Sequence, residues 1–483
     1  MNSRSIDEIY MNGANYYEDE IDSYSQYLMK NLKKYPPYKD ENQIEQEKIS
    51  EIIDNEEIRI ERPLRRSRID DIRSERPDRH YSKNKTTKNH MSLNSSEISE
   101  KKNNPRLTEN RIDFIKTISD KVSLPYMIDA NIDTNNVLNY AKTNKRYVNI
   151  QELFYRMNIK LEYVCSGVTG HTFKGIDSDT GEIKFAVKVC AYPRTRIFGT
   201  TNNSKRPENV EIRMIRLLSS FVVNKLNPHI VLPIYSFDTS INNFLNPSSV
   251  NVDISNKKNS LYKNFISKHE EGVFFETVSV LISEWCNGGD LLNYIKNNYK
   301  NMTLRIWTVI IFQVLITLCQ IQNKYPAFRH NDLKLNNILV EVSDDVIDPS
   351  YRYTYVVNDT KFIIPNINLK IMIWDFDFSC IKYFIENNKV NSTWANEMNI
   401  SNDENKYYDM HYFLNTLRNP KFFAEFYSEH VPKEIIEFVH RVIPLKYRKG
   451  IHINNRYRIL VNDEYTTPLK VLMTDKLFEK YRF

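Results

Sequence analysis

Hydrophobic and polar positions divide the chain into a polar beginning, a strand-rich middle and a helix-rich end. Residues 1–110 mix charges of both signs with few large apolar side chains. Such a segment buries too little apolar surface to offset the entropy lost on ordering, so we predict a disordered tail. Residues 111–159 regain apolar positions and predict short helices that lead into the rest of the chain.

Short apolar runs follow from about residue 160. They are rich in Val, Ile, Phe and Tyr, which is typical of β-strands. The runs are Lys160–Val164, Ile183–Val189, Ile230–Ser236 and Val278–Glu284. Among them, Asn209–Leu226 has helical spacing, whereas the Asn- and Ser-rich segment Asp238–Gly272 predicts an insertion loop.

Helical spacing dominates after Gly289. Apolar residues recur every three or four positions in one stretch, which predicts a buried amphipathic helix. These residues are Leu304, Trp307, Ile311, Val314, Leu315 and Leu318. A strand-rich part followed by a helix-rich part predicts an α+β fold of two lobes with a cleft between them.

Composition narrows the class of protein. The 483 residues carry a net charge of +6, which is mild for this length and does not by itself argue for nucleic acid or membrane. The five cysteines are widely spaced and form no C-x-x-C pair, which argues against a disulfide framework or a zinc site. The longest apolar stretch, Trp307–Cys319, is judged too short to span a bilayer, so we expect a soluble protein with no transmembrane segment. Arg65, Arg66 and Arg68 leave open a contact of the tail with acidic partners, although a solvated tail is the favoured alternative.

The clearest chemical signal lies at residues 330–337, which read H-N-D-L-K-L-N-N. Asp332, Lys334 and Asn337 have the spacing that a phosphoryl-transfer loop needs. The Asp would accept the proton of an attacking hydroxyl, the Lys would neutralise the moving phosphoryl group, and the Asn would ligate Mg²⁺.

A second acidic signal ends the apolar run I-M-I-W-D-F-D at residues 371–377. Asp375 stands at the end of a predicted strand, where a metal-binding carboxylate would lie. Asn337 and Asp375 together form the predicted metal site.

Lys188 lies inside the apolar strand F-A-V-K-V, where a buried charge needs a partner. We expect that partner on the helix that follows, with Glu211 as the first choice and Glu208 as the alternative. Gly167 and Gly170 precede this lysine in a turn whose backbone could approach phosphates closely, and an ordinary hairpin turn is the alternative.

Taken together, these motifs resemble those of protein kinases. Residues 330–337 are similar to the catalytic loop H-R-D-L-K-x-x-N, and residues 375–377 are similar to the metal-binding D-F-G. The combination with W-D-F-D-F-S and Y-Y-D-x-H-x-F resembles the Ser/Thr kinases of large DNA viruses, those of poxviruses and of mimivirus-type giant viruses. The resemblance covers residues 160–483. It implies a bilobal kinase fold, with a small β-rich lobe, a hinge and a larger helical lobe at 160–283, 284–289 and 290–483.

The same resemblance implies an activity, its cofactors and a location. Such a kinase transfers the γ-phosphate of ATP, bound with Mg²⁺ or Mn²⁺, to Ser or Thr hydroxyls of protein substrates, in the host cytoplasm and the virion. Lys334 favours Ser/Thr over Tyr, and Lys188 would contact the α- and β-phosphates. Backbone groups of Glu284 and Cys286 would pair with adenine, and Asp290 would contact the ribose or only cap the next helix. The loop over the phosphates would consist of Cys165, Ser166, Gly167, Val168, Thr169, Gly170, His171, Thr172 and Phe173.

Three residues depart from the kinase pattern. Cys165 replaces the first glycine of the phosphate loop, Asn331 replaces the arginine that clamps a phosphorylated activation segment, and Asp377 replaces the glycine of D-F-G. Because the chemical residues are all present, we expect an active enzyme that needs no loop phosphorylation. Two alternatives stay open: a pseudokinase that acts as a virion scaffold, and a small-molecule phosphotransferase of kinase-like fold. The resemblance also places Asp409 against the catalytic-loop backbone, and we expect His411 to be a packed helix residue.

Overall fold

The computed structural model describes residues 108–132, 147–167, 170–343, 351–462 and 465–483. The predicted disordered tail lies outside the described residues, apart from its last three positions, which open helix α5 (Thr108–Lys121). Val168 and Thr169 of the predicted phosphate loop also lie outside them. The domain boundaries given above stay predictions.

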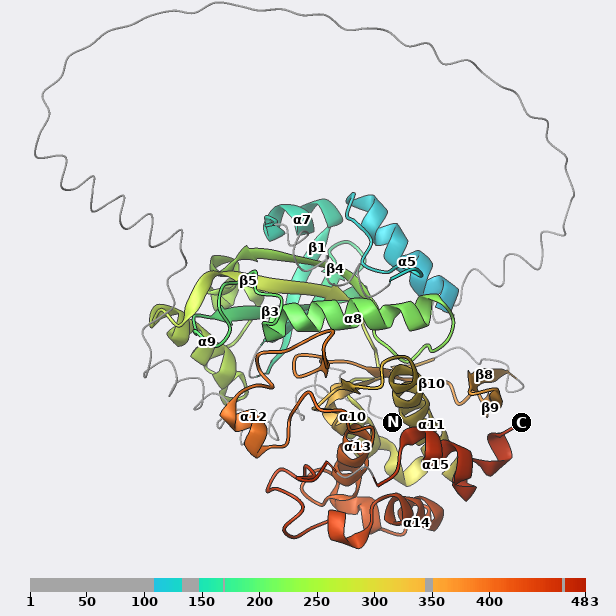
Figure 1. Ribbon diagram of the computed structural model, residues 1–483. Coiled ribbons are helices and arrows are strands. Elements are labelled where there is room, and N and C mark those ends of the chain that lie inside the picture. The colour runs from blue at the N-terminus through green and yellow to red at the C-terminus, as the bar shows by residue number, and fades with distance from the viewer. Residues whose placement is uncertain (1–107, 133–146, 168–169, 344–350, 463–464) are drawn as a thin grey trace, which may run out of the picture. The chain divides into compact units, whose positions relative to one another are not determined.

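Five antiparallel strands form the main sheet, in the order β1-β2-β3-β5-β4 (Figure 1). They are β1 (Ile159–Ser166), β2 (His171–Asp177), β3 (Ile183–Pro193), β4 (Pro233–Ser240) and β5 (Phe274–Ser283). Four of them lie where apolar runs predicted strands. The sequence did not predict β2, because Lys174 and Gly175 interrupt its apolar pattern; pairing with β1 and β3 on its two sides stabilises it.

Three helices pack against this sheet. Helix α8 (Pro207–Val223) contacts β4, α5 contacts both β4 and α8, and α7 (Ile150–Met157) contacts β1 (Figure 1). Pro207 opens α8, where its missing N–H leaves no hydrogen bond unmade. Helix α8 therefore covers most of the predicted segment, and α5 and α7 are short helices of the kind predicted for 111–159.

The predicted insertion loop at 238–272 is wrong, because most of this segment is helical. It forms η3 (Ile241–Phe244), η4 (Pro247–Val250), η5 (Lys257–Asn259) and helix α9 (Ser260–Glu270). The side chains of Ser240, Asn246 and Asn256 accept hydrogen bonds from backbone N–H groups at the starts of the three 3₁₀ helices. Asn and Ser cap helices as readily as they form loops, so this composition did not distinguish the two.

Short antiparallel ladders bring the chemical motifs together. Strand β7 (Ile338–Val342) pairs with β10 (Leu369–Ile373), and β6 (Phe328–Arg329) pairs with β11 (Cys380–Ile381). A separate hairpin joins β8 (Arg352–Val357) to β9 (Thr360–Pro365). In the first ladder Ile338 stands opposite Ile373, so the end of the catalytic loop and the start of the D-F-D motif share one end of the ladder.

The helical part follows the main sheet in sequence. Its α-helices are α10 (Leu291–Asn298), α11 (Leu304–Lys324), α12 (Thr393–Glu397), α13 (Tyr408–Arg418), α14 (Lys433–Val442) and α15 (Pro468–Thr474). Its 3₁₀ helices are η6 (Tyr299–Asn301), η7 (Leu335–Asn337), η8 (Ala424–Tyr427), η9 (Leu445–Tyr447) and η10 (Lys476–Tyr481). Helix α11 contacts α13, α14, α15 and β10, which makes it the centre of this part.

Helix α11 is longer than its apolar pattern indicated. It extends the apolar stretch Trp307–Cys319 at both ends, and its 21 residues make it, among the described residues, the one helix long and apolar enough to cross a membrane. Most of its apolar stretch is nevertheless buried inside the protein, with Trp307, Ile311 and Phe312 fully enclosed. It is therefore the core helix that the three- and four-residue spacing predicted.

Candidate active site

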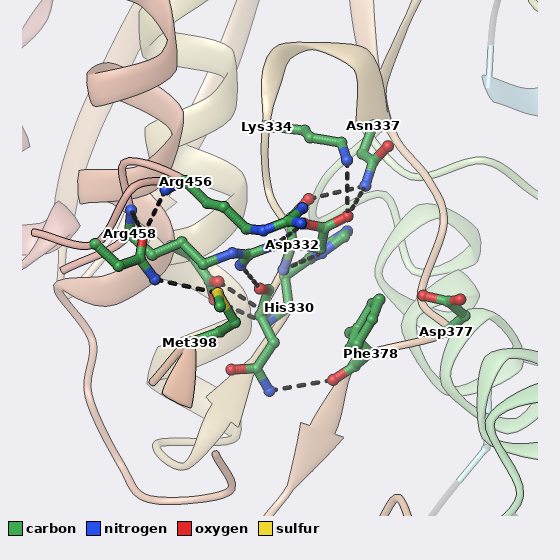
Figure 2. A network of polar contacts seen from close by, with 12 residues as sticks. His330, Asp332, Lys334, Asn337, Asp377, Phe378, Met398, Arg456 and Arg458 are labelled. Atoms are coloured by element: carbon green, nitrogen blue, oxygen red, sulfur yellow. Dashed lines mark hydrogen bonds and ion pairs between the residues drawn. The ribbon is translucent and has the colours of Figure 1, made fainter. Parts of the chain in front are cut away.

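Residues 330–337, the predicted catalytic loop, hold the carboxylate of Asp332 through several polar contacts. Its Oδ2 accepts a hydrogen bond of 2.7 Å from Asn337 Nδ2 and lies 3.4 Å from Lys334 Nζ (Figure 2). Asn337 Nδ2 also donates to the Asp332 carbonyl at 2.9 Å. The three side chains predicted from the spacing at 330–337 therefore converge on one another, and all three are buried.

Arg458 is a fourth member of this group that the sequence did not reveal. Its Nη2 forms an ion pair with Asp332 Oδ1, and its Nη1 donates to the Asn331 carbonyl (Figure 2). The guanidinium also lies 4.1 Å from the ring centroid of Tyr412. Because the two ionic partners are 126 residues apart, no local pattern predicted the contact.

Lys188 makes the contact that its burial in an apolar strand required. Its Nζ lies 2.6 Å from Glu211 Oε1 and 2.7 Å from Asp375 Oδ1. The ion pair expected with Glu211, the first choice, is present. Glu208, the alternative, instead pairs with Arg206 at 3.2 Å.

The charges of this cluster are strongly interdependent. Burial opposes a charge on Lys188, but the neighbouring Asp375 and Glu211 carboxylates outweigh it and raise the pKa of the lysine. Burial likewise opposes ionisation of Asp375, yet the Lys188 cation outweighs it and lowers the pKa of that carboxyl. Burial raises the pKa of Glu211 to about 7, only partly offset by Lys188. The lysine therefore stays cationic and Asp375 stays anionic at neutral pH.

Two residues at the centre of the site have left-handed backbone. Asn331 has φ of 64° and Asp375 has φ of 65°. Among residues other than glycine, Asn and Asp adopt this conformation most readily.

Helix α13 holds the predicted catalytic loop through the side chain of Asp409. Asp409 accepts hydrogen bonds from the backbone N–H groups of His330 at 2.7 Å and Asn331 at 2.9 Å, which confirms the predicted contact. His330 Nε2 lies 2.9 Å from the Trp374 carbonyl, so the loop is also tied to the D-F-D motif. His411 is the packed helix residue expected: it is fully buried, and its Nε2 lies 2.7 Å from the Tyr447 carbonyl.

The turn before Lys188 is closed by its two glycines. The N–H of Gly167 donates to the Gly170 carbonyl at 2.8 Å. A Cβ atom on Gly170 would lie 2.7 Å from Cys190 Sγ and 3.0 Å from the Val189 carbonyl oxygen, so only glycine fits against β3 here. The backbone of this turn is thereby held close to the strand that carries Lys188.

Side chains around this turn hydrogen-bond to, or pack against, other side chains of the protein. Ser166 Oγ lies 2.7 Å from His171 Nδ1 and 2.8 Å from Tyr163 Oη. The ring of His171 packs on Tyr262 of helix α9, and burial lowers its pKa to about 3, so it carries no charge for a phosphate. Burial also raises the pKa of the Cys165 thiol to about 11. Two further residues of the predicted phosphate loop lie in β2: Thr172 stands opposite Lys188 in the sheet, and Phe173 is buried against Phe244.

The predicted hinge lies between β5 and α10. The Glu284 N–H donates to the Leu232 carbonyl at 3.1 Å, and Cys286 is buried. Asp290 caps α10: its carboxylate accepts from the Asn293 N–H at 3.0 Å and from Asn293 Nδ2 at 2.6 Å. Burial raises the pKa of Asp290 to about 6. The capping role left open by the sequence is present, and a contact with ribose stays a prediction.

Comparison with known proteins agrees with this arrangement. The family model described as poxvirus serine/threonine protein kinase matches residues 200–481. The chain belongs to the poxvirus serine/threonine protein kinase family. A protein of Acanthamoeba polyphaga mimivirus, named as a putative serine/threonine-protein kinase, is 51% identical over 378 residues, which cover 78% of this chain and 81% of the relative.

More distant relatives have similar names. A second mimivirus protein named in the same way is 25% identical over 43% of this chain and 57% of its own length. Serine/threonine-protein kinase 2 of swinepox virus is 37% identical over 91 residues, 19% of this chain and 17% of that protein. The viral kinase family predicted from the motifs is thereby confirmed. Lys188 and the glycine turn precede the residues that the family model matches.

Residues 375–409, which we predict to be the activation segment, are held to the predicted catalytic loop by hydrogen bonds from Asn331. Asn331 Nδ2 donates to the carbonyls of Phe378 at 3.1 Å and Ser401 at 3.0 Å. Although Asn331 lacks the charge of the arginine that it replaces, its side chain contacts the segment at two positions that are far apart in the sequence.

Arg329, which precedes the catalytic loop, adds further contacts to the activation segment. Its Nη1 donates to Ser401 Oγ at 2.7 Å and its Nη2 to the Asn399 carbonyl at 2.7 Å. The guanidinium lies 3.9 Å from the ring centroid of Tyr408 and is fully buried. The sequence did not single out this residue, although it stands immediately before the H-N-D motif.

The metal that the kinase family implies has two suitable oxygen ligands here. Asn337 immediately precedes β7 and Asp375 lies just after β10, at the end of the ladder where Ile338 and Ile373 pair, and the Trp374 N–H donates to the Asn337 carbonyl at 3.3 Å. Among the described residues, no group of three or more His, Cys, Asp and Glu forms a metal cage. One amide and one carboxylate nevertheless fit Mg²⁺, which proteins commonly hold through one or two side chains together with substrate phosphates.

Proposed function

We propose that this member of the family is an active protein kinase, which transfers the γ-phosphate of ATP to Ser or Thr hydroxyls of protein substrates. The observation that carries the proposal is the position of Lys188. Its ammonium contacts both Glu211 and Asp375, so a cation for the nucleotide phosphates and a carboxylate for the metal converge at one point. A buried lysine held between two acids is suited to bind phosphate groups, because its cation would offset their negative charge.

The nucleotide would lie between the glycine turn and the hinge, in a bilobal arrangement of the kinase type. Gly167 and Gly170 have no side chains, so their backbone would approach the phosphates closely. Backbone groups of Glu284 and Cys286 would pair with adenine. A bound Mg²⁺, held by Asn337 and Asp375, would neutralise charge on the phosphate oxygens.

Asp332 would act as the base of the transfer. It would accept the proton from the Ser or Thr hydroxyl as that oxygen bonds to the γ-phosphorus and the bond to the β-phosphate oxygen breaks. Asn337 and Lys334 orient its Oδ2, and Lys334 would also stabilise charge on the moving phosphoryl group. The viral relatives support our further proposal that the activity acts in the host cytoplasm and in the virion.

The decisive experiment incubates the purified full chain with radiolabelled ATP, Mg²⁺ or Mn²⁺, and a generic basic protein substrate. We expect label on Ser and Thr, and Asp332→Asn should lower the rate at least about a hundredfold, roughly 2.7 kcal/mol of barrier. Asp403→Asn removes an exposed acid of the activation segment and serves as the matched control.

Two results would favour the alternatives. Thermal stabilisation by ATP with no transfer from the wild-type protein would indicate a pseudokinase scaffold. Transfer to small-molecule hydroxyls but not to protein would indicate a small-molecule phosphotransferase.

A further inference from the structure

Arg111 of helix α5 connects the N-terminal segment to the hinge. Its Nε lies 3.1 Å from Glu284 Oε2, and its Nη2 lies 2.6 Å from Glu284 Oε1, so the guanidinium grips both carboxylate oxygens. A planar fork matches a carboxylate in this way, and such paired contacts fix orientation as well as distance.

The same guanidinium also holds the connection between α8 and β4. Nη1 donates to the Pro228 carbonyl at 2.8 Å, and Nη2 donates to the Ile230 carbonyl at 2.9 Å. These carbonyls belong to the connection between α8 and β4. Nη2 further lies 3.9 Å from Met372 Sδ, on the strand that leads to Asp375.

Burial makes these contacts consequential. Arg111 is only 7% exposed, and the side chain of Glu284 is 12% exposed. A buried charge that loses its partner is left without compensation, so neither residue tolerates removal of the other. The α5 residue therefore belongs to the framework of the hinge, although it lies 173 residues earlier in the sequence.

We infer that Arg111 is a positioning residue for the nucleotide. It fixes Glu284, and with it the backbone of the hinge, in the place where adenine binds. The inference rests on the proposed function, because it takes residues 284–289 as the adenine site. It also makes α5 a required part of the catalytic unit, although this helix precedes the residues matched by the family model.

The test compares the full chain with its Arg111→Met variant by hydrogen exchange and by steady-state kinetics. Without nucleotide, amides of residues 283–290 should exchange about tenfold faster in the variant, because local opening no longer has to break the contacts between Arg111 and Glu284. The KM for ATP should rise about fivefold with kcat changed less than twofold, because the residue acts on nucleotide placement and not on the transfer step. Arg111→Lys keeps the charge but not the fork, so it should give intermediate values, and it serves if Arg111→Met folds poorly.

Arg206 offers a matched control. It is as buried as Arg111 and likewise donates to two carbonyls, of Gly199 and Pro193, and to one glutamate, Glu208. Arg206→Met should destabilise the protein to a similar degree while leaving exchange at 283–290 unchanged.

The outcomes separate this inference from the proposed function. If wild-type protein transfers phosphate but Arg111→Met changes neither hinge exchange nor the KM for ATP, the inference fails alone. Faster exchange with an unchanged KM overturns the positioning role and leaves a structural one. If the wild-type protein neither binds nor uses ATP, the proposed function fails, and the nucleotide-positioning role fails with it.

Discussion

Asp377 Oδ2 lies 2.5 Å from Lys389 Nζ, and both side chains are almost completely buried. The acid stands where other kinases carry the glycine of D-F-G, and the lysine lies twelve residues further along the activation segment. Lys389 Nζ also lies 3.5 Å from the ring centroid of Phe378, and Asn387 Nδ2 donates to the Asp377 carbonyl at 2.8 Å. The departure at Asp377 therefore gives the start of the activation segment an internal ion pair.

This ion pair leads to a prediction about phosphorylation. Asn331 and the Asp377–Lys389 pair already hold the activation segment, and Ser392, a candidate phosphosite, uses its hydroxyl to cap α12 and to bond the Lys389 carbonyl. A phosphate at Ser392 or Thr393 would find no arginine at position 331, and Arg329 is already bonded to Ser401 and Asn399, so it should order the segment little further. Phosphatase treatment of active enzyme, followed by removal of the phosphatase, should lower the initial rate by less than about threefold, under 0.7 kcal/mol. A tenfold loss that rephosphorylation at Ser392 or Thr393 restores would contradict this.

Removing the cation of the pair should be costly. Lys389→Met removes the cation that is ion-paired with the buried Asp377 carboxylate, so we expect the free energy of unfolding to fall by about 3 kcal/mol. Urea unfolding of the full chain measures this change. Lys382→Met breaks an exposed ion pair with Asp403 and should cost less than about 1 kcal/mol. The double variant Asp377→Asn/Lys389→Met should recover much of the loss; if it is as unstable as Lys389→Met alone, the buried charge is not the cause.

Asp290 gives the stability a predictable pH dependence. Burial raises the pKa of its carboxyl to about 6 from an ordinary value of 3.8, so between these values the folded protein binds a proton that the unfolded chain does not. Stability from this group is therefore present at low pH and is lost as pH rises through 6. Relative to Asp290→Asn, which keeps the cap but cannot titrate, the wild-type protein should lose about 1 kcal/mol between pH 5 and pH 7. Parallel urea titrations at the two pH values measure it, and an equal pH response in both proteins would show that Asp290 is not protonated on folding.

Local chemistry explains which parts of the site were predictable. Lys188 in an apolar strand needed an acid, and the next helix offered Glu211 at the right place. Asp332, Lys334 and Asn337 lie within one short loop, so their convergence follows from spacing alone.

Long-range contacts explain what the sequence left out. Arg458 and Arg111 meet their acids across 126 and 173 residues, and an arginine in a polar stretch carries no sign of its partner. The helices at 241–270 were missed for a different reason, since Asn and Ser favour loops and helix caps alike.

Arg458 yields the last prediction, because it contacts Oδ1 of Asp332, the proposed base, whereas Asn337 contacts Oδ2. Its cation pairs with Asp332 Oδ1 while Asn337 and Lys334 contact Oδ2, so the carboxylate is fixed from both sides. Arg458→Met removes the ion pair at Oδ1, so the carboxylate is held less firmly toward the acceptor hydroxyl. We expect kcat to fall about tenfold, 1.4 kcal/mol of barrier, with the KM for ATP unchanged, because the hinge and Lys188 are untouched. Arg458→Lys should recover part of kcat, since it restores a cation without the second contact to the Asn331 carbonyl. Arg441→Met on α14, which breaks the ion pair with Asp475, is the control and should leave kcat within twofold. An Arg458→Met enzyme with wild-type kcat, or one whose loss lies in the KM for ATP, would show that Arg458 does not position the base.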